Sequence, residues 1–293
     1  MANGPYTVTT AEKHIDEVWE VGTIDALEFE CKLGNLVDKS WKFVGHGDVY
    51  HKPRFPNIAV QTKTADTDLT PTTYTDTEQT ITINVHQACA IKVENIVSVL
   101  SRDDVKSHMS QKMGYALGRA VDVAIAALAQ NFSQVVGTLG ADPSYDDLLD
   151  VVGYLEDAGY IPSENCNLVI STQMRRAMMK IDQFIHSDYR GEGNAVKAST
   201  RGEIGTWQGL PIITHQFLRA PAAGQHESFA FHKESIAVIM AENQKTTVET
   251  IALAQSDVVV KANIYGLAEI NRYSEAAGNI TATDEGCVLF RGK

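Results

Sequence analysis

A periodic apolar pattern over residues 101 to 132 constrains the fold of this chain more than any other feature. Its apolar residues recur every three or four positions, as on one buried helix face: Val105, Met109, Met113, Leu117, Val121, Ala124, Leu128 and Phe132. About 30 residues rise roughly 45 Å along a helix axis, whereas an average globular helix has about 11 residues. The chain must therefore accommodate a long rod beside any compact domain.

The segments after this rod alternate between helical and strand-like patterns. Residues 144 to 159 predict a helix capped by Ser144 and Asp147, and residues 167 to 171 predict a buried strand. A second helix is expected at residues 172–181, followed by a loop and by strands at 210–216, 228–232, 236–241, 246–251 and 257–273. This order predicts an α+β fold with a mixed or antiparallel sheet.

Two segments before the rod predict parts that project from the body. Residues 10 to 34 are expected to form two short amphipathic helices, with Ile15, Val18 and Trp19 on one apolar face. Each is too short to be stable alone in water. Residues 47 to 94 predict a long hairpin with a wide polar tip, and a lone hairpin is marginally stable. Both projections need cover, and a neighbouring subunit is the simplest source of it.

Composition excludes several classes of protein. The net charge of −12 argues against a free surface that grips nucleic acid, because phosphate binding needs clustered Lys and Arg. The four cysteines (Cys31, Cys89, Cys166 and Cys287) form no CxxC pair and are expected to be small buried hydrophobes. The sequence shows neither a signal peptide nor an apolar run of membrane-spanning length, so we expect no membrane step.

A search for catalytic and metal-binding motifs predicts that the chain is not an enzyme and holds no cofactor. The nine histidines form no HExxH pattern, and Asp66 and Asp68 form only an Asp-x-Asp pair on a polar tip. The alternative of a different class is a soluble α+β metal-dependent hydrolase that uses His215 and His232. It would require a monomer or small oligomer with bound metal.

Several stretches, in their order and spacing, resemble the major capsid proteins of tailed bacteriophages, which have the Hong Kong ninety-seven-type fold. "EVWEVGTIDALEFECKLGNLVDKSWKF" is similar to the N-terminal arm of that family, and "GHGDVYHKP" with "LTPTTYTDTEQTITINVHQACAIKVENI" to its extended loop. "SRDDVKSHMSQKMGYALGRAVDVAIAAL" resembles its spine helix, and "SYDDLLDVVGYLEDAGYIPSENCNLVISTQMRRAMMK" resembles part of its axial domain. The resemblance covers nearly the whole chain.

The resemblance implies a division into five segments. These are an N-terminal arm (1–46), an extended loop (47–94), a peripheral domain with the spine helix (95–142), an axial domain (143–255), and a return to the peripheral domain with the C-terminal segment (256–293). It also implies subunit contacts by the extended loop and the arm. The loop residues expected there are Lys52, Arg54, Lys63, Asp66 and Asp68, and the arm residues are Ile15, Val18 and Trp19.

A short glycine-rich stretch, "GEIGTWQGLPII", is expected to frame the axial domain. Gly205 and Gly209 would permit tight turns, Trp207 would anchor the stretch on the core, and Pro211 would open a strand where it need not donate a ladder bond. The alternative is an ordinary loop-to-strand turn that any α+β protein could contain.

The function that the resemblance implies is self-assembly. Hexamers and pentamers would close an icosahedral virion head around double-stranded DNA, in the cytoplasm of a host bacterium. The expected partners are other copies of the chain, a portal protein, a cement protein and a separate scaffolding protein, since only about 46 residues precede the loop. Some members crosslink Lys to Asn; Lys63 lies in the right loop, but no matching Asn and Glu are found. A closer alternative is an encapsulin shell around a cargo enzyme.

Overall fold

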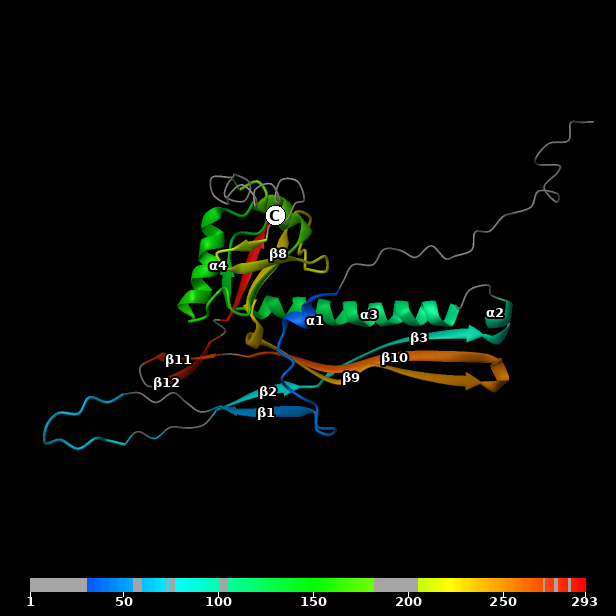
Figure 1. The fold of residues 1–293 in the computed structure, drawn as a ribbon, viewed down its shortest axis with the longest axis horizontal. Coiled ribbons are helices and arrows are strands. Elements are labelled where there is room, and N and C mark those ends of the chain that lie inside the picture. Colours follow the sequence, from blue (N-terminus) through cyan, green and yellow to red (C-terminus); the bar gives the residue numbers. More distant parts are fainter. Residues whose placement is uncertain are drawn as a thin grey trace, which may run out of the picture.

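The computed structural model describes residues 31–54, 60–71, 73, 77–100, 105–181, 205–270, 272–276, 279–283 and 286–293. A compact domain built on a six-stranded sheet lies at one end of a long helix, α3 (Figure 1). A three-stranded sheet runs along that helix, and a separate two-stranded hairpin projects beside it. The chain thus combines one compact domain with two extended parts.

The six-stranded sheet has the order β4-β13-β8-β5-β7-β6. Its strands are β4 (Gln134–Val136), β5 (Cys166–Ile170), β6 (Thr206–Trp207), β7 (Leu210–Thr214), β8 (His226–His232) and β13 (Cys287–Gly292). Strand β13 pairs parallel with β4, β5 pairs parallel with β7, and the other pairs are antiparallel. The predicted α+β class with a mixed sheet is therefore confirmed.

Both faces of this sheet are covered, and side chains alternate between them along each strand. In β5, Leu168 and Ile170 join the cluster formed with helices α4 (Tyr145–Asp157) and α5 (Thr172–Met178). Val169 points to the opposite face and joins a second cluster, with Val121 and Ile125 of α3. Strands β5, β8 and β13 are largely hydrophobic in sequence because both of their faces are buried.

Helix α4 begins where the sequence predicts. The Ser144 hydroxyl accepts the Asp147 backbone N–H at 3.1 Å, and the Asp147 carboxylate accepts the Ser144 N–H at 2.8 Å. This capping box satisfies backbone donors that the first helical turn cannot pair internally. Helix α5 uses Ser171 in the same way, through the Met174 N–H.

Helix α3 (Val105–Leu128) confirms a long helix, with 24 residues and a length of about 36 Å. It ends earlier than the sequence predicts, because a 3-10 turn (Ala129–Asn131) follows Leu128 and Phe132 is extended. Burial along it is uneven. Its second half contributes Val121, Ile125 and Ala126 to the second cluster, whereas its first half is mostly partly or fully exposed. The helix is therefore anchored by its C-terminal half and extends away from the compact domain.

The three-stranded sheet beside α3 has the order β3-β10-β9, from β3 (Val85–Glu94), β10 (Ser256–Glu269) and β9 (Ile236–Ile251). Both pairings are antiparallel. The short helix α2 (Asn95–Leu100) follows β3 at the far end. Burial alternates along β3 because one face of the strand lies toward α3.

The extended hairpin is shorter than the sequence predicts. Strand β1 (Val49–Arg54) pairs with β2 (Thr77–Thr82), but the next strand, β3, leaves the hairpin and pairs with β10. The expected boundary at residue 94 thus lies at the end of a strand that belongs to another sheet. Alternation shows that a segment is a strand, but it does not identify the strand with which it pairs.

The expected boundary at residue 255 also differs from the sheet boundaries. Strand β9, expected as two strands within the axial segment, is a single strand of 16 residues that pairs with β10 along the long helix. Strand β13, expected in the peripheral return, lies inside the six-stranded sheet. The reason is that both segments pair with strands distant in sequence.

A third, small cluster joins the hairpin to the body. Ile81 of β2 is buried against Ala237 and Ile239 of β9. Strand β10 also approaches the hairpin closely at Gly266, where an added Cβ would lie 2.5 Å from the Thr82 carbonyl oxygen. Only glycine fits there without moving the backbone of β2.

Substitution at Gly266 tests this close approach. We expect Gly266→Ala to lower the free energy of unfolding by about 1–3 kcal/mol, because a rigid backbone oxygen occupies the space of the new methyl group. Urea unfolding of the full chain measures this. Gly153→Ala is the matched control: no atom lies within 4 Å of that Cβ on α4, and the helix gains up to about 1 kcal/mol. A neutral Gly266→Ala would contradict the packing described.

Candidate assembly surfaces

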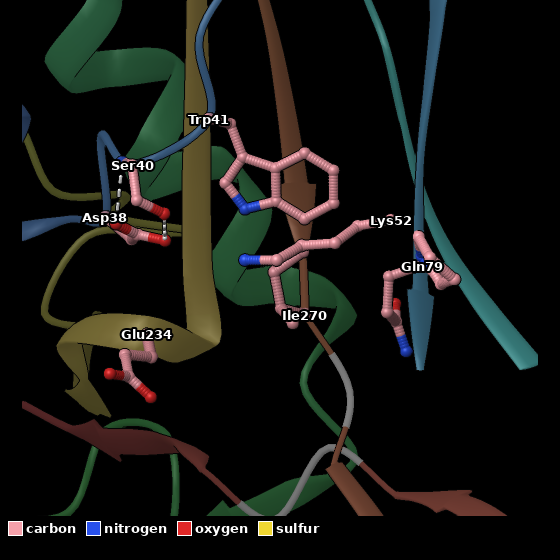
Figure 2. A pocket seen from close by; sticks show the side chains of 8 residues that line it. Asp38, Ser40, Trp41, Lys52, Gln79, Glu234 and Ile270 are labelled. Carbon is pink, nitrogen blue, oxygen red and sulfur yellow. Dashed lines mark hydrogen bonds between the residues drawn. The ribbon is translucent and has the colours of Figure 1, made fainter. Parts of the chain in front are cut away.

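The root of the extended hairpin contains a cavity of about 310 Å³. Figure 2 shows that its walls come from three parts of the chain, namely the segment after the short helix α1 (Leu33–Leu36), the hairpin, and the body. The lining residues are Asp38, Ser40, Trp41, Lys52, Pro53, Gln79, Glu234 and Ile270. A change in the angle of the hairpin would therefore alter this cavity.

Lys52 is one of the residues expected at a subunit contact, and the structure places it at this root. Its Nζ lies 5.2 Å from the centroid of the Trp41 ring, a cation–π distance. The Asp38 carboxylate on the same wall accepts hydrogen bonds from the backbone and hydroxyl of Ser40. Lys52 thus stabilises the hairpin against its own subunit in the isolated chain.

The tip of the hairpin places Lys63, Asp66 and Asp68 together. A turn forms there, because both the N–H and the hydroxyl of Thr67 donate to the Thr64 carbonyl, and Asp66 has a positive φ of 62°. Every residue from 60 to 71 is exposed. Exposed apolar side chains, Val60 and Leu69, accompany the charges. This stretch contributes nothing to a core of its own subunit.

The five expected loop residues therefore do not form one site. Lys52 lies at the root and Lys63, Asp66 and Asp68 at the tip, while Arg54 ends strand β1 and its side chain lies outside the description. The expected arm residues Ile15, Val18 and Trp19 also lie outside the described residues.

The far end of the three-stranded sheet presents a second exposed apolar surface. It consists of Ile96 and Val97 of α2, Val248 and Ile251 of β9, and Leu253 in the turn between β9 and β10. The backbone joins α2 to this turn, since the Asn95 N–H donates to the Gln255 carbonyl. We name these five residues the distal patch. Exposed apolar side chains at the end of an extended element suit contacts with another protein.

Polar contacts hold this sheet on the first half of α3, where few apolar side chains are buried. The Lys106 ammonium donates to the Asp257 carboxylate at 2.6 Å, and the Lys261 ammonium donates to the Ser110 carbonyl at 2.8 Å. The side-chain amide of Gln244 donates to the Gly114 carbonyl at 3.2 Å. These contacts fix the direction of the distal patch relative to the compact domain.

The glycine-rich stretch forms a tight hairpin at the edge of the six-stranded sheet. Gln208 and Gly209 link β6 to β7, with φ values of 45° and 86°, as in the two-residue turns that suit twisted strands. An added Cβ at Gly209 would lie 3.0 Å from the Cβ of Ser163. Gly205 also has a positive φ of 73°.

Trp207 and Pro211, on either side of this turn, contact neighbouring parts of the domain. The Trp207 ring packs edge-on against Tyr145 at 5.4 Å and lies against the first cluster. Pro211 lies opposite Thr206 of β6, and the next residue, Ile212, donates its N–H to the Gly205 carbonyl and begins the parallel register with β5. No observed backbone bond requires an N–H at Pro211. The stretch links the edge of the sheet to the start of α4.

The structure gives no support to a hydrolase that uses His215 and His232. The His215 Nε2 lies 2.9 Å from the Asp122 carboxylate, and the His232 ring stacks on Tyr160 at 4.6 Å. In the described part of the chain, no group of three or more His, Cys, Asp or Glu side chains could hold a metal ion. Among those same residues, no helix has the length and hydrophobicity to cross a membrane.

Sequence reasoning missed Asp122, although a signal was present. Asp122 interrupts the apolar face of α3 beside Val121 and is only 2% exposed. A carboxylate at such a position requires partners. Its pairing with His215, 93 residues away, is visible only in the folded chain.

Solved phage structures share this fold over the full length of the chain. A chain of Mycobacterium phage Che8 is 19% identical and covers 94% of this chain and 96% of its own, with a TM-score of 0.74. The capsid structure of cyanophage P-SCSP1u is 15% identical and covers 99% of this chain and 96% of its own, with a TM-score of 0.77. The head structure of Helicobacter pylori bacteriophage KHP40 is 8% identical and covers 100% of this chain and 99% of its own, with a TM-score of 0.79. No family model and no curated protein matches the sequence.

These likenesses confirm the fold that the sequence resemblance implied. The chain has the fold of tailed-phage major capsid proteins, including the projecting hairpin and the long helix. TM-scores of 0.74 to 0.79 establish the fold, whereas sequence identities of 8 to 19% leave the function to be argued from the surfaces.

The ion pair at the far end of α3 predicts a pH dependence. Hydrogen bonds from Lys106 and then from Thr250 hold the pKa of the Asp257 carboxyl below its ordinary value of 3.8. The stabilisation is therefore present above that value and is lost as the pH falls below it. We expect Asp257→Asn to lower the urea midpoint at pH 7, and the difference from wild type to shrink below about pH 4.

The control for this experiment is Asp150→Asn, which removes the same charge from an exposed position on α4. It should change the midpoint little at any pH. A difference at Asp257 that persisted undiminished at pH 3 would contradict an electrostatic origin.

Proposed function

We propose that the chain is a structural, non-enzymatic major capsid protein. Its copies assemble as hexamers and pentamers into an icosahedral phage head that encloses double-stranded DNA. The observation that carries this proposal is the hairpin tip, where every residue from 60 to 71 is exposed, including Val60 and Leu69. A segment of this length without a core of its own needs contacts from other copies.

The two exposed surfaces suit repeated contacts between copies. The hairpin tip supplies charged and apolar side chains at one extremity, and the distal patch supplies apolar side chains at the end of the three-stranded sheet (Figure 1). Surfaces at separate extremities allow one subunit to contact several neighbours at once. An icosahedral shell of identical subunits requires each subunit to contact several neighbours.

The charge of the chain suits a container for DNA. A net charge of −12 disfavours tight adhesion of the wall to phosphate, so we propose contact with packaged DNA without sequence-specific binding. The proposed partners are other copies, a separate scaffolding protein during assembly, a portal protein at one vertex and a cement protein. Assembly would take place in the host bacterial cytoplasm, and the product would be the virion capsid.

As part of this proposal, we assign the extended loop, the peripheral domain, the axial domain and the arm to parts of the structure, and we take their boundaries from the strand pairing. The extended loop corresponds to the β1–β2 hairpin, and the peripheral domain to α3 with the β3-β10-β9 sheet. The axial domain corresponds to the six-stranded sheet with α4 and α5, and residues 1–46 contain the arm.

Removal of the hairpin tip tests the proposal. We expect replacement of residues 60–71 by a short Gly-Ser linker to leave the melting temperature within a few degrees, because none of these residues is buried. The yield of shells, measured by negative-stain microscopy and sedimentation, should fall at least about tenfold. An equivalent replacement of residues 220–223, which are also exposed, is the control and should assemble normally. Wild-type yields without the tip would contradict the proposal, as would native particles that enclose protein cargo in place of DNA.

Covalent joining of subunits is a separate question. Lys63 lies exposed at the tip, but no Asn and Glu partners for it are identified in the sequence, so we expect shells without covalent crosslinks. Mature shells boiled in detergent should give a single band near 32.0 kDa. A ladder of higher bands, abolished by Lys63→Ala, would show that crosslinks form.

A further inference from the structure

The first described residues of the N-terminal segment are held by a buried carboxylate on α3. The Asp122 side chain accepts the backbone N–H of Lys32 at 2.9 Å and that of Gly34 at 3.0 Å. The Leu33 N–H approaches the same group at 3.4 Å. One side chain thus pairs with three successive backbone donors located about 90 residues earlier.

These donors belong to the start of helix α1 (Leu33–Leu36), which has no cap of its own. Lys32 occupies the cap position and makes no side-chain capping bond. A helix of four residues is unstable without external support, and its first N–H groups have no partner within the helix. Asp122 supplies from a distance the acceptor that an N-cap residue usually supplies locally.

His215 holds this carboxylate from the other side. Its Nδ1 accepts the Phe217 backbone N–H at 3.2 Å, so the ring proton lies on Nε2, which donates to Asp122 Oδ2 at 2.9 Å. The imidazole is fully buried, and the His215 backbone N–H donates to the Ile170 carbonyl of β5. Asp122 is therefore attached to the six-stranded sheet through His215.

A second, independent anchor lies a few residues further along the chain. The Asp38 N–H donates to the Ile236 carbonyl, and the Asp38 carbonyl accepts the Val238 N–H. Leu33 and Val37 between the two anchors are buried in the second cluster. If the first anchor is lost, the second remains, so the body can stay folded while the residues before Leu33 are released.

We propose that Asp122, oriented by His215, is a positioning residue that sets the direction in which the N-terminal arm leaves the body. The inference rests on the proposed function, in which the arm reaches neighbouring copies. The Asp122 bonds hold residues 32–34 to both α3 and the six-stranded sheet, so the chain before Lys32 leaves every subunit from the same point and in the same direction. Without these bonds, we expect the subunit to fold but the direction of this exit to vary between copies.

Hydrogen exchange of the unassembled chain tests the geometry directly. Asp122→Asn preserves shape but removes the charge and replaces one acceptor oxygen by a donor group. We expect amide exchange at residues 32–34 to accelerate at least about tenfold, because bonds to a charged acceptor are lost. Exchange at Asp38 and Val238 should remain within about twofold of wild type, because the second anchor is intact.

Variants of His215 test the second half of the proposal. His215→Gln retains an amide N–H that can donate to Asp122, whereas His215→Phe retains a ring of similar shape without a donor. We expect the Gln variant to exchange at residues 32–34 more slowly than the Phe variant. Equal rates would show that His215 does not orient the carboxylate, and would overturn its part in the proposal.

Assembly provides the readout that a general loss of stability would not produce. Ser144→Ala removes the capping bond of α4, far from α1 in the fold, and serves as the matched destabilised control. Asp150→Asn controls for the loss of charge at an exposed position. At equal folded fractions, we expect Asp122→Asn to give at least about tenfold fewer regular shells, and both controls to assemble as wild type does.

The outcomes separate this inference from the proposed function. Unchanged exchange at residues 32–34 in Asp122→Asn overturns the inference, whether or not shells form. Accelerated exchange with shells of normal yield and size overturns the positioning role. Failure of the wild-type chain to form shells, even with partner proteins, overturns the proposed function instead.

Discussion

The structure depends on the packing of one half of α3 against two sheets at once. Val121 and Ile125 contact residues of the six-stranded sheet, such as Val169 and Phe229, and also residues near the start of β9 and the end of β10. A single buried stripe therefore joins the compact domain to the extended part. Because interiors are densely packed, this shared cluster sets the angle between the two parts and permits little continuous adjustment.

Beyond that junction the balance of forces changes along the helix. The first half of α3 and the paired strands have few buried side chains, and ion pairs and hydrogen bonds such as Lys106–Asp257 and Lys261–Ser110 hold them together. Single polar contacts of this kind, which are partly buried, contribute little each. The distal patch lies at the end of this part, which consists of α3 and one sheet and has few buried side chains. Contacts with other copies would therefore stabilise the region in which the isolated chain buries least apolar surface.

The β1–β2 hairpin and the N-terminal segment are attached to the body in a similar way, each by a few contacts. The hairpin is attached by the packing of Ile81 and by the Lys52–Trp41 pair. Residues 32–34 are attached by Asp122, which His215 holds. Few contacts allow a segment to be positioned without a large core of its own. In the proposed shell, such attachments would determine where neighbours are met, whereas the central clusters fold the subunit and set the angle between its two parts.

The sequence by itself determined the elements whose signals are local. The period of α3 and the Ser144–Asp147 cap both follow from side chains within a few positions of one another. The resemblance to phage capsid proteins, carried by the order of these elements, agrees with the fold. Local patterns suffice here because helix and strand periodicities arise within a few residues.

Only the tertiary structure decided which distant segments meet. Three features join residues far apart in the chain. Strand β3 pairs with β10, β13 pairs with β8 inside the six-stranded sheet, and Asp122 bonds to both Lys32 and His215. A strand exposes the same unpaired groups to any partner, and a buried carboxylate accepts from any donor that reaches it. The choice among partners is made when the whole core packs, because only one arrangement buries the apolar faces and satisfies the polar groups together.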